Sequence, residues 1–392
     1  MTSREPWLDD PLGYLIGPER IETFFAKTYE REALIVHHDA AQRFDGLLNI
    51  DDVDRIVTSV DLREGQLSLA DATREMNANQ YVDASGFIDR GAVADQYRGG
   101  ATIILNQAHQ FEPKLARLCK GLEHVFSSHV QANLYLTPPN AQGFRTHYDN
   151  HDVLVIQVEG EKVWRLYDMP IETPFRGEGF EPGKYETGAL RQEFVLKAGD
   201  CAYVPRGLMH DAQTSGNVAS LHVTVGLIAR TWADLILEAV SEVALRSPEL
   251  RRSLPAGFAH PNFDRDAARK QLSTLAGLLA QEIKLDPALD LMVDTFIRSR
   301  PAENRFSILH ASKDLTASDR FVLKRHAPFR IAEDGDNIVV IGPGGDLDFT
   351  ASNRAALERA LNGEPFGLGD LKGEKVDALV STLLAYGLLI RV

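Results

Sequence analysis

Cysteine is scarce in this sequence of 392 residues: only Cys119 and Cys201 occur, and they lie far apart. This excludes a disulfide scaffold and a zinc site built from CxxC pairs. Long hydrophobic runs are also lacking, and none approaches the ~20 residues needed to cross a bilayer. The first ten residues are polar and acidic and show no signal-peptide pattern, so we expect a cytoplasmic protein without a membrane segment.

Positive charge is in short supply as well. The chain has 42 Lys and Arg against 56 Asp and Glu, a formal net charge of -14. Nucleic-acid binding normally requires a basic surface, so we expect no direct nucleic-acid partner. An acidic surface instead suits a basic protein or peptide, although many soluble proteins are simply acidic.

Hydrophobic periodicity predicts a change of architecture near residue 130. The length suggests two or three domains. Residues 11–60 show a mostly helical pattern around a short strand at 33–37. A second strand is predicted at 101–105, and a helix at 112–126 has apolar residues at helical spacing.

Beyond residue 130 the sequence predicts short strands punctuated by Gly and Pro, the pattern of a jelly roll or barrel. The predicted strands are 132–137, 153–158, 162–167, 192–196, 201–205 and 219–225. Because Gly160 separates two of them by a short turn, we expect 153–158 and 162–167 to form a hairpin.

After Arg230 the pattern becomes helical, with three apolar stripes that would pack on the barrel or pair two subunits. The last ~90 residues mix short strands with two helices, which resembles a small winged-helix unit. A winged helix that bound DNA should carry a basic recognition helix. The predicted helix 376–386 has Asp377 as its only ionised side chain, which argues against that role.

A candidate metal site comes from two separated segments. His147 and Asp149 are two residues apart, so on a strand both side chains would point to one face. His210 follows a Val-Pro-Arg-Gly segment, from which a loop would bring it alongside. Two histidines and one carboxylate with open positions suit non-haem Fe(II). Two alternatives stay open. His147 and Asp149 could instead form a hydrogen-bonded pair on the surface. On a strand, His151 would also point to the same side as His147, so strand periodicity does not exclude it as a ligand.

Three more polar residues are candidates for a binding pocket. Lys162, directed into the barrel, would pair with the distal carboxylate of a 2-oxo acid, because an unpaired buried charge is very costly. The residues alone favour the alternative, a solvated turn at 159–162. Asn133 and Tyr135 share one face of a predicted strand, where they would line a pocket or simply fill the barrel interior. We expect Trp164 to belong to the core.

Four blocks of this sequence resemble the JmjC-type, cupin-like ribosomal oxygenases. The blocks are 133–139 (NLYLTPP), 142–149 (QGFRTHYD), 153–167 (VLVIQVEGEKVWRLY) and 204–210 (VPRGLMH). Their order and spacing both agree with that family. The resemblance is strong from about residue 100 to 226 and weak beyond about 300, and it covers most of the chain.

The resemblance implies an α+β fold: a double-stranded β-helix (jelly-roll, JmjC) core with a helical N-terminal region, a helical dimerisation segment and a C-terminal winged-helix-like domain. The implied boundaries are 1–228 for the catalytic domain (core about 100–228), 229–300 for a dimerisation domain and 301–392 for the winged helix. The implied cofactors are Fe(II), 2-oxoglutarate and O2. The implied iron ligands are His147, Asp149 and His210. The implied cosubstrate residues are Lys162, with Asn133 and Tyr135 lining the pocket.

The implied activity is hydroxylation of a protein side chain, with a basic ribosomal protein as substrate and a homodimer as the assembly. Members with lysine at the position of Lys162 resemble histidyl hydroxylases, and those with arginine there resemble arginyl ones. Gly226 departs from the family, since some members carry a serine there, which leaves the substrate pocket open to question. The alternatives are a 2-oxoglutarate oxygenase acting on another peptide or small molecule, and an inert winged-helix adaptor. Lysine demethylation is disfavoured because no aromatic cage is evident.

Overall fold

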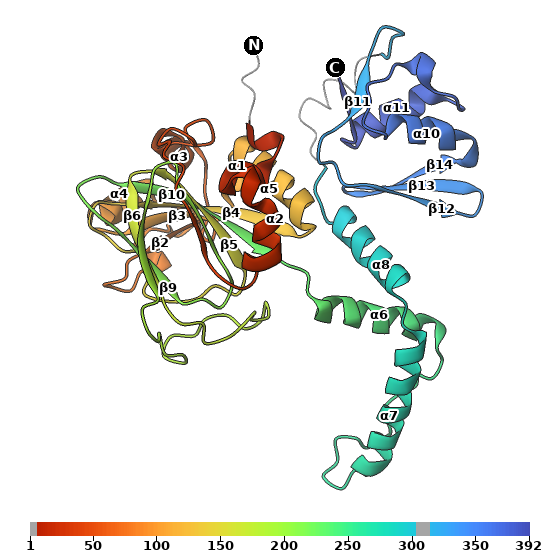
Figure 1. The fold of residues 1–392 in the computed structure, drawn as a ribbon, viewed down its shortest axis with the longest axis horizontal. Helices are drawn as coiled ribbons and strands as arrows, with labels where there is room; N and C mark the ends of the chain where they lie inside the picture. The colour runs from red at the N-terminus through yellow and green to blue at the C-terminus, as the bar shows by residue number, and fades with distance from the viewer. Residues whose placement is uncertain (1–5, 303–313) are drawn as a thin grey trace. The chain divides into compact units, whose positions relative to one another are not determined.

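The computed structural model describes residues 6–302 and 314–392, and its chain divides into two compact units, Met1–Ala229 and Arg230–Val392 (Figure 1). Each unit has a hydrophobic core of its own. Among the described residues, no helix has the length and apolar character needed to cross a membrane.

Two antiparallel sheets build the first unit. The larger sheet has the strand order β1 (Leu34–Val36), β8 (Cys201–Val204), β5 (Asp152–Glu159), β10 (Ser220–Ile228), β4 (His129–Thr137), β3 (Thr102–Leu105) and β2 (Leu67–Ala70). The smaller sheet has the order β7 (Gln192–Lys197), β6 (Glu161–Leu166) and β9 (His210–Thr214). This is the jelly roll expected from the run of short strands, and that part of the predicted fold is confirmed.

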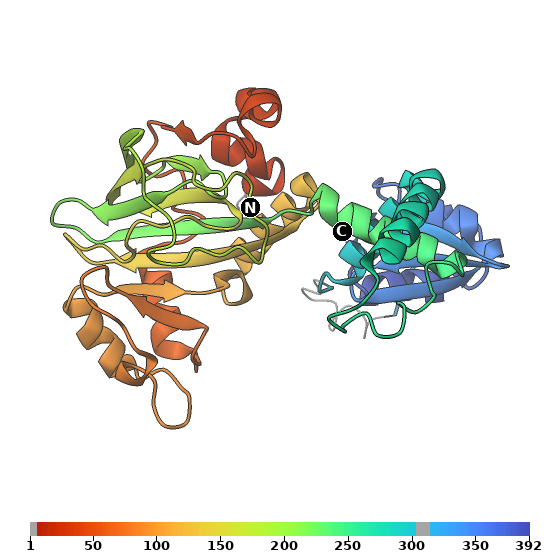
Figure 2. The ribbon, with the colours of Figure 1, turned by 90° about the horizontal axis from the view of Figure 1, so that it is seen from below.

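The larger sheet is covered by helices on its outer face. Side chains alternate along each strand, so one set of apolar residues, such as Val223 and Val225 of β10, joins the main core. The helices that contribute to this core are α1 (Pro11–Ile16), α3 (Ile50–Ser59), α4 (Arg90–Arg98) and α5 (Pro113–Phe126), with the single turn α2 (Ile21–Thr23) preceding β1. Figure 2 shows the strands, yellow to green, running side by side with the red N-terminal helices against them.

The opposite set of side chains points between the two sheets. Here a smaller apolar cluster that includes Val155, Trp164 and Leu196 shares the interior with polar residues. His222 on β10 and Lys162 on β6 are among the buried polar side chains. A polar interior in a jelly roll is where a ligand site is expected.

The predicted hairpin at Gly160 is wrong. Strand β5 pairs with β10 and β8, whereas β6 pairs with β7 and β9, so the two strands belong to different sheets. Gly160 has φ +66, and a Cβ on it would lie 2.2 Å from the carbonyl oxygen of Ala219. The glycine therefore lets the chain pass close to Ala219 as it crosses from one sheet to the other. A turn signal alone does not distinguish this crossing from a hairpin.

In the second unit, three helices coincide with the three predicted apolar stripes. They are α6 (Trp232–Arg246), α7 (Arg265–Glu282) and α8 (Leu285–Arg298). The elements that follow are β11 (Phe321–Leu323), β12 (Arg330–Asp334), β13 (Asn337–Gly342), β14 (Gly345–Thr350), α10 (Arg354–Ala360), α11 (Val376–Ala385) and β15 (Leu389–Arg391). Strands β12, β13 and β14 form one antiparallel sheet, and β11 pairs with β15. Helices and short strands thus occur as expected, while the winged-helix assignment stays a prediction.

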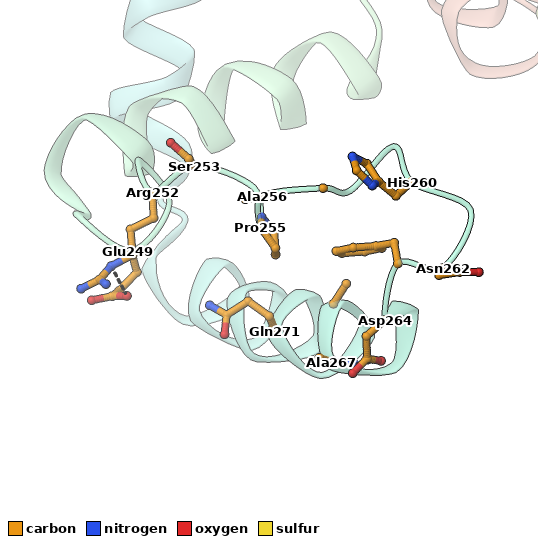
Figure 3. A pocket seen from close by; sticks show the side chains of 13 residues that line it. Glu249, Arg252, Ser253, Pro255, Ala256, His260, Asn262, Asp264, Ala267 and Gln271 are labelled. Carbon is orange, nitrogen blue, oxygen red and sulfur yellow. Dashed lines mark hydrogen bonds and ion pairs between the residues drawn. The ribbon is translucent and has the colours of Figure 1, made fainter.

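The loop that connects α6 to α7 folds back along α7 and borders an open pocket of about 830 Å³ (Figure 3). Its lining runs from Glu249 to Gln271, with His260 on the loop and Asp264 at the start of the helix. None of the residues predicted to bind metal or cosubstrate lines this pocket.

Candidate metal and cosubstrate site

His147, Asp149 and His210 come together as a group whose ligand atoms all lie within 4.8 Å of one another. The Nε2 of His147 is 4.0 Å from one oxygen of Asp149, and the Nε2 of His210 is 3.8 Å from the other. One cation can contact all three residues at these separations. Among the described residues, this is the group that offers a metal at least three such ligands.

The backbone explains why the two histidines meet. His147 and His210 form an isolated antiparallel bridge in which each N–H donates to the other's carbonyl, at 3.0 and 2.7 Å. The prediction that residues 147–149 lie on a regular strand is wrong, since only His147 has a strand-like partner. His210 is likewise the first residue of β9 and not part of a loop. Directly paired residues point to the same side of a ladder, so the bridge has the effect that the strand was expected to have.

Hydrogen bonds orient both imidazoles. The Nδ1 of His147 lies 2.9 Å from the carbonyl of Arg145, and the Nδ1 of His210 lies 2.9 Å from that of Leu208. A carbonyl accepts only, so each Nδ1 carries the proton and each Nε2 keeps its lone pair for a metal. A hydrogen bond from the ring nitrogen that does not face the metal is usual for metal-binding histidines.

Electrostatics keep the group in its coordinating form. Burial, with a contribution from His147, lowers the pKa of His210 to about 4, so this imidazole is neutral at pH 7. Burial alone would raise the pKa of Asp149, but the nearby imidazoles of His147, His210 and His151 outweigh it and hold that pKa below its usual value. An anionic carboxylate beside a neutral imidazole suits a divalent cation.

His151, which alternation could not exclude, and its neighbour Asp152 both have other places. His151 is outside the metal group, and its ring occupies the space that a Cβ on Gly226 would need, with ring atoms at 2.7 and 2.8 Å. Asp152 is fully buried, accepts a hydrogen bond from the Tyr203 hydroxyl at 2.6 Å and pairs with the Arg206 guanidinium at 2.6 Å. Asp152 therefore anchors the turn before His210 and does not face a metal.

Lys162 is buried, which excludes the solvated turn that the residues alone favoured. Its side chain is 4% exposed, and its Nζ donates to the Thr137 hydroxyl at 2.9 Å. No carboxylate in the described part of the chain forms an ion pair with it. Burial lowers the pKa of Lys162 to about 7. An ammonium buried without a counter-ion is costly, so this position suits an anionic ligand.

Asn133 and Tyr135 lie on the same face of β4, as predicted, and this face points between the sheets. The Asn133 side chain accepts a hydrogen bond from the backbone N–H of Gln107 at 2.9 Å. Burial, and then the charge of Asp149, raises the pKa of Tyr135, which places this phenol near the metal group. Trp164 is buried, as expected of a core residue, and its ring stacks on that of His210.

Sequence reasoning missed His222, which is buried on β10 with its ring stacked on Tyr135. It missed Thr137, the hydrogen-bond partner of Lys162, and Asp211, which accepts hydrogen bonds from Thr146 and Tyr167 beside the metal group. A signal did exist for His222. Polar residues alternate with apolar ones from Ser220 to Val225, which on a buried strand indicates a polar interior face.

The segment that carries this site is similar in sequence to known proteins. A JmjC domain family matches residues 104–235, which include all the metal and cosubstrate candidates. The chain is 29% identical over 412 residues to the bifunctional lysine-specific demethylase and histidyl-hydroxylase NO66 of Dictyostelium discoideum, covering 96% of this chain and 76% of that protein. It is 26% identical to ribosomal oxygenase 1 of Danio rerio, covering 95% and 73%. The chain therefore carries a JmjC domain, and over most of its length it is similar to the JmjC ribosomal oxygenases.

This family consists of 2-oxoglutarate-dependent oxygenases, and the chain is an enzyme of that class. The human ribosomal oxygenase 1 is longer: the match, at 32% identity, spans 62% of this JmjC chain and 39% of the human protein. The fold is also that of YcfD, a ribosomal oxygenase from Escherichia coli solved with cobalt and 2-oxoglutarate. The TM-score is 0.54 at 13% identity, over 94% of this chain and 97% of YcfD.

Proposed function

We propose that this enzyme is an Fe(II)- and 2-oxoglutarate-dependent hydroxylase of a protein side chain, with a histidine of a basic ribosomal protein as the favoured target. The observation that carries the proposal is the pairing of two features between the same sheets. One is the group of His147, Asp149 and His210. The other is Lys162, which is buried and has no carboxylate partner among the described residues.

His147, Asp149 and His210 would hold the iron. The donor set fits: two Nε2 lone pairs and one carboxylate are the ligands of non-haem Fe(II) sites, and three ligands leave open positions. When bound, the metal supplies the activation of dioxygen in those positions. The protein's own part is to keep the His210 imidazole neutral, keep Asp149 anionic and hold both rings by their Nδ1 hydrogen bonds.

Lys162 would bind the distal carboxylate of 2-oxoglutarate. The carboxylate would supply the counter-ion that the buried ammonium lacks, and Thr137 would orient the ammonium from the other side. Tyr135 and Asn133 would line the space between this end and the metal, which agrees with the effect of Asp149 on the Tyr135 phenol. A ligand with an anionic group at each end fits both features at once.

The substrate assignment rests on charge and on the relatives. A net charge of -14 favours a basic partner, and ribosomal proteins are basic. The Dictyostelium relative is named a histidyl-hydroxylase, and Lys162 agrees with that subgroup. The rings of Phe144 and Phe180 lie 5.4 and 6.3 Å from that of His147, and Phe144 is exposed. These rings offer apolar surface beside the metal group to a target side chain.

We also propose that residues 229–300 mediate a homodimer, between a catalytic domain at 1–228 and a winged-helix domain at 301–392, and that the protein works in the cytoplasm. The support for the dimer is exposed apolar surface: Trp232 is 77% exposed, Leu245 76% and Leu272 69%. Large apolar side chains exposed to this degree are what an interface would cover. In sedimentation experiments the wild type should run as two chains and a Leu245→Glu, Leu272→Glu variant as one. A single-chain wild type would contradict the dimer.

The activity test follows succinate and peptide mass together. The enzyme with Fe(II) and 2-oxoglutarate is exposed to air with and without a digest of ribosomal proteins. Succinate that rises with the digest, together with a histidyl peptide heavier by one oxygen atom, supports the proposal. A His210→Ala variant should form neither. Succinate without a modified peptide would indicate another substrate. If the protein bound neither metal nor 2-oxoglutarate, the remaining hypothesis would be an inert winged-helix adaptor.

A further inference from the structure

Two buried ring nitrogens in the interior between the two sheets have no hydrogen-bond partner among the described residues. They are the Nδ1 of His222 and the Nε1 of Trp164. Lys162 donates to one hydroxyl, so further N–H bonds of its ammonium are available. Each buried donor left unsatisfied costs about 1–3 kcal/mol, so native interiors contain few of them. Several in one interior point to a bound ligand that supplies an acceptor.

The ring of His222 is held in a fixed plane. Strand register places His222 opposite Tyr135 on β4, and the two rings stack with centroids 4.7 Å apart and an angle of 6°. The ring of Trp164 meets His222 edge-on at 5.9 Å, and its face stacks on His210, also at 5.9 Å. A continuous set of rings therefore connects the metal ligand His210 to His222.

His222 and Lys162 face the same space. His222 stacks on Tyr135 and Lys162 donates to Thr137, and these two partners are two residues apart on β4, so the two groups lie close together. Burial, and then the charge of the Lys162 ammonium, holds the pKa of His222 well below its ordinary value. Both are nitrogen donors, and neither has a carboxylate partner among the described residues. Like groups gathered without an anion are unfavourable in the empty site and favourable once an anion is bound.

One competing acceptor exists within the chain. His222 lies opposite Gln157 on β5, and the Oε1 of Gln157 is also buried without a partner. The amide nitrogen of Gln157 is already used, since it donates to the Ser220 hydroxyl at 2.7 Å and to the carbonyl of Glu159 at 2.8 Å. A small rearrangement that joined Gln157 to His222 would satisfy one donor and leave Trp164 and Lys162 as they are.

We propose that His222 is a positioning residue for the cosubstrate: a ring N–H of His222 donates to the distal carboxylate of 2-oxoglutarate, the same carboxylate that Lys162 pairs with. The inference rests on the proposed function. Two donors from different sheets, β10 and β6, fix the position of the carboxylate more tightly than one. His222 thereby contributes to selection of 2-oxoglutarate over 2-oxo acids that are shorter or lack the second carboxylate.

The test measures binding to the full chain with Mn(II) in place of iron, so that no turnover occurs. 2-Oxoglutarate and pyruvate, which lacks the distal carboxylate, are titrated calorimetrically into the wild type and two variants. His222→Phe keeps a stacking ring and removes the N–H, whereas His222→Asn keeps an amide N–H near the Nδ1 position. His260→Gln, at an exposed histidine of the second unit, is the control.

We expect His222→Phe to weaken 2-oxoglutarate binding about 10-fold or more, the worth of one hydrogen bond to a charged group, with Mn(II) and pyruvate binding unchanged. His222→Asn should recover part of the loss, and His260→Gln should match the wild type. Equal losses for both acids, or a lower melting temperature with unchanged affinities, would overturn the inference and favour the contact with Gln157. Failure of the wild type to bind 2-oxoglutarate would instead defeat the proposed function.

A second measurement on the wild type covers the case in which His222→Phe does not fold. The ring N–H signals of ¹⁵N-histidine-labelled protein are followed by NMR as each acid is added. A His222 signal that shifts with 2-oxoglutarate and not with pyruvate supports the contact. A signal that responds equally to both, or to neither, contradicts it.

Discussion

The substitution Lys162→Met removes an ammonium group that the fold buries beside one hydroxyl, that of Thr137. Burial lowers the pKa of Lys162 from 10.5 to about 7, and each pH unit corresponds to ~1.4 kcal/mol. The protonated side chain therefore destabilises the empty protein by about 5 kcal/mol at pH 6. Methionine fills a similar volume without charge, so the variant should be more stable than the wild type by an amount up to about that size, and should lose 2-oxoglutarate binding.

The stability difference between Lys162→Met and the wild type should depend on pH. Between pH 7 and 10.5 the unfolded chain holds a proton on Lys162 that the folded chain has released. The unfolding free energy of the wild type therefore rises with pH across this window through Lys162. The variant lacks this contribution, so its advantage should shrink from about 5 kcal/mol at pH 6 to about 2 kcal/mol at pH 9.

Urea unfolding of the metal-free proteins at both pH values measures the effect. Lys197→Met, at the exposed end of β7, is the matched control and should change stability little. The reasoning would be refuted if Lys162→Met were less stable than the wild type at pH 6. It would also be refuted if the difference between the two proteins did not depend on pH.

Four further outcomes are expected. Because empty Lys162 titrates near pH 7 and the bound form is paired, the Kd for 2-oxoglutarate should rise with pH above about 7, as calorimetry would show; a flat profile contradicts this. Asp152→Asn should lower the unfolding free energy by about 3 kcal/mol in urea, since the buried Arg206 loses a charge partner; a change within ~0.5 kcal/mol would be contrary evidence. Gly160→Ala should cost more than ~2 kcal/mol in the same assay, because its Cβ would clash with the Ala219 carbonyl, and a neutral result would argue against the crossing turn. His147→Ala should abolish Mn(II) binding seen by electron paramagnetic resonance, and retained binding would place the metal elsewhere.

Much of the fold could be predicted because the deciding signals are local. The strands from 132 to 225 have short apolar runs between Gly and Pro, and the helices after 230 show clear apolar stripes. The pairing of strands could not be predicted in the same way. Whether the turn at Gly160 joins paired strands or crosses between sheets depends on what lies next to it, here Ala219, which is 59 residues away in sequence.

The metal group was predictable in its members but not in its geometry. Residue types and spacing pointed to His147, Asp149 and His210, while the bridge that joins the two histidines is a long-range backbone contact. For Lys162 the residues alone favoured the wrong environment, since Glu159-Gly-Glu161 looks like a solvated turn. Lys162 is buried because β6 is the central strand of the smaller sheet and the lysine side chain points toward the larger sheet, where it meets Thr137 of β4.

The central claim is that the enzyme transfers oxygen from O2 to a protein side chain. The most direct measurement is mass spectrometry of intact ribosomal proteins after incubation with the enzyme, Fe(II) and 2-oxoglutarate under ¹⁸O2, with His210→Ala as the control. We expect one ribosomal protein to be heavier by a single ¹⁸O atom, on a histidine, in the wild-type sample only. Turnover of 2-oxoglutarate with no labelled ribosomal protein would contradict the proposed substrate, and an identical label in the His210→Ala sample would contradict the proposed site.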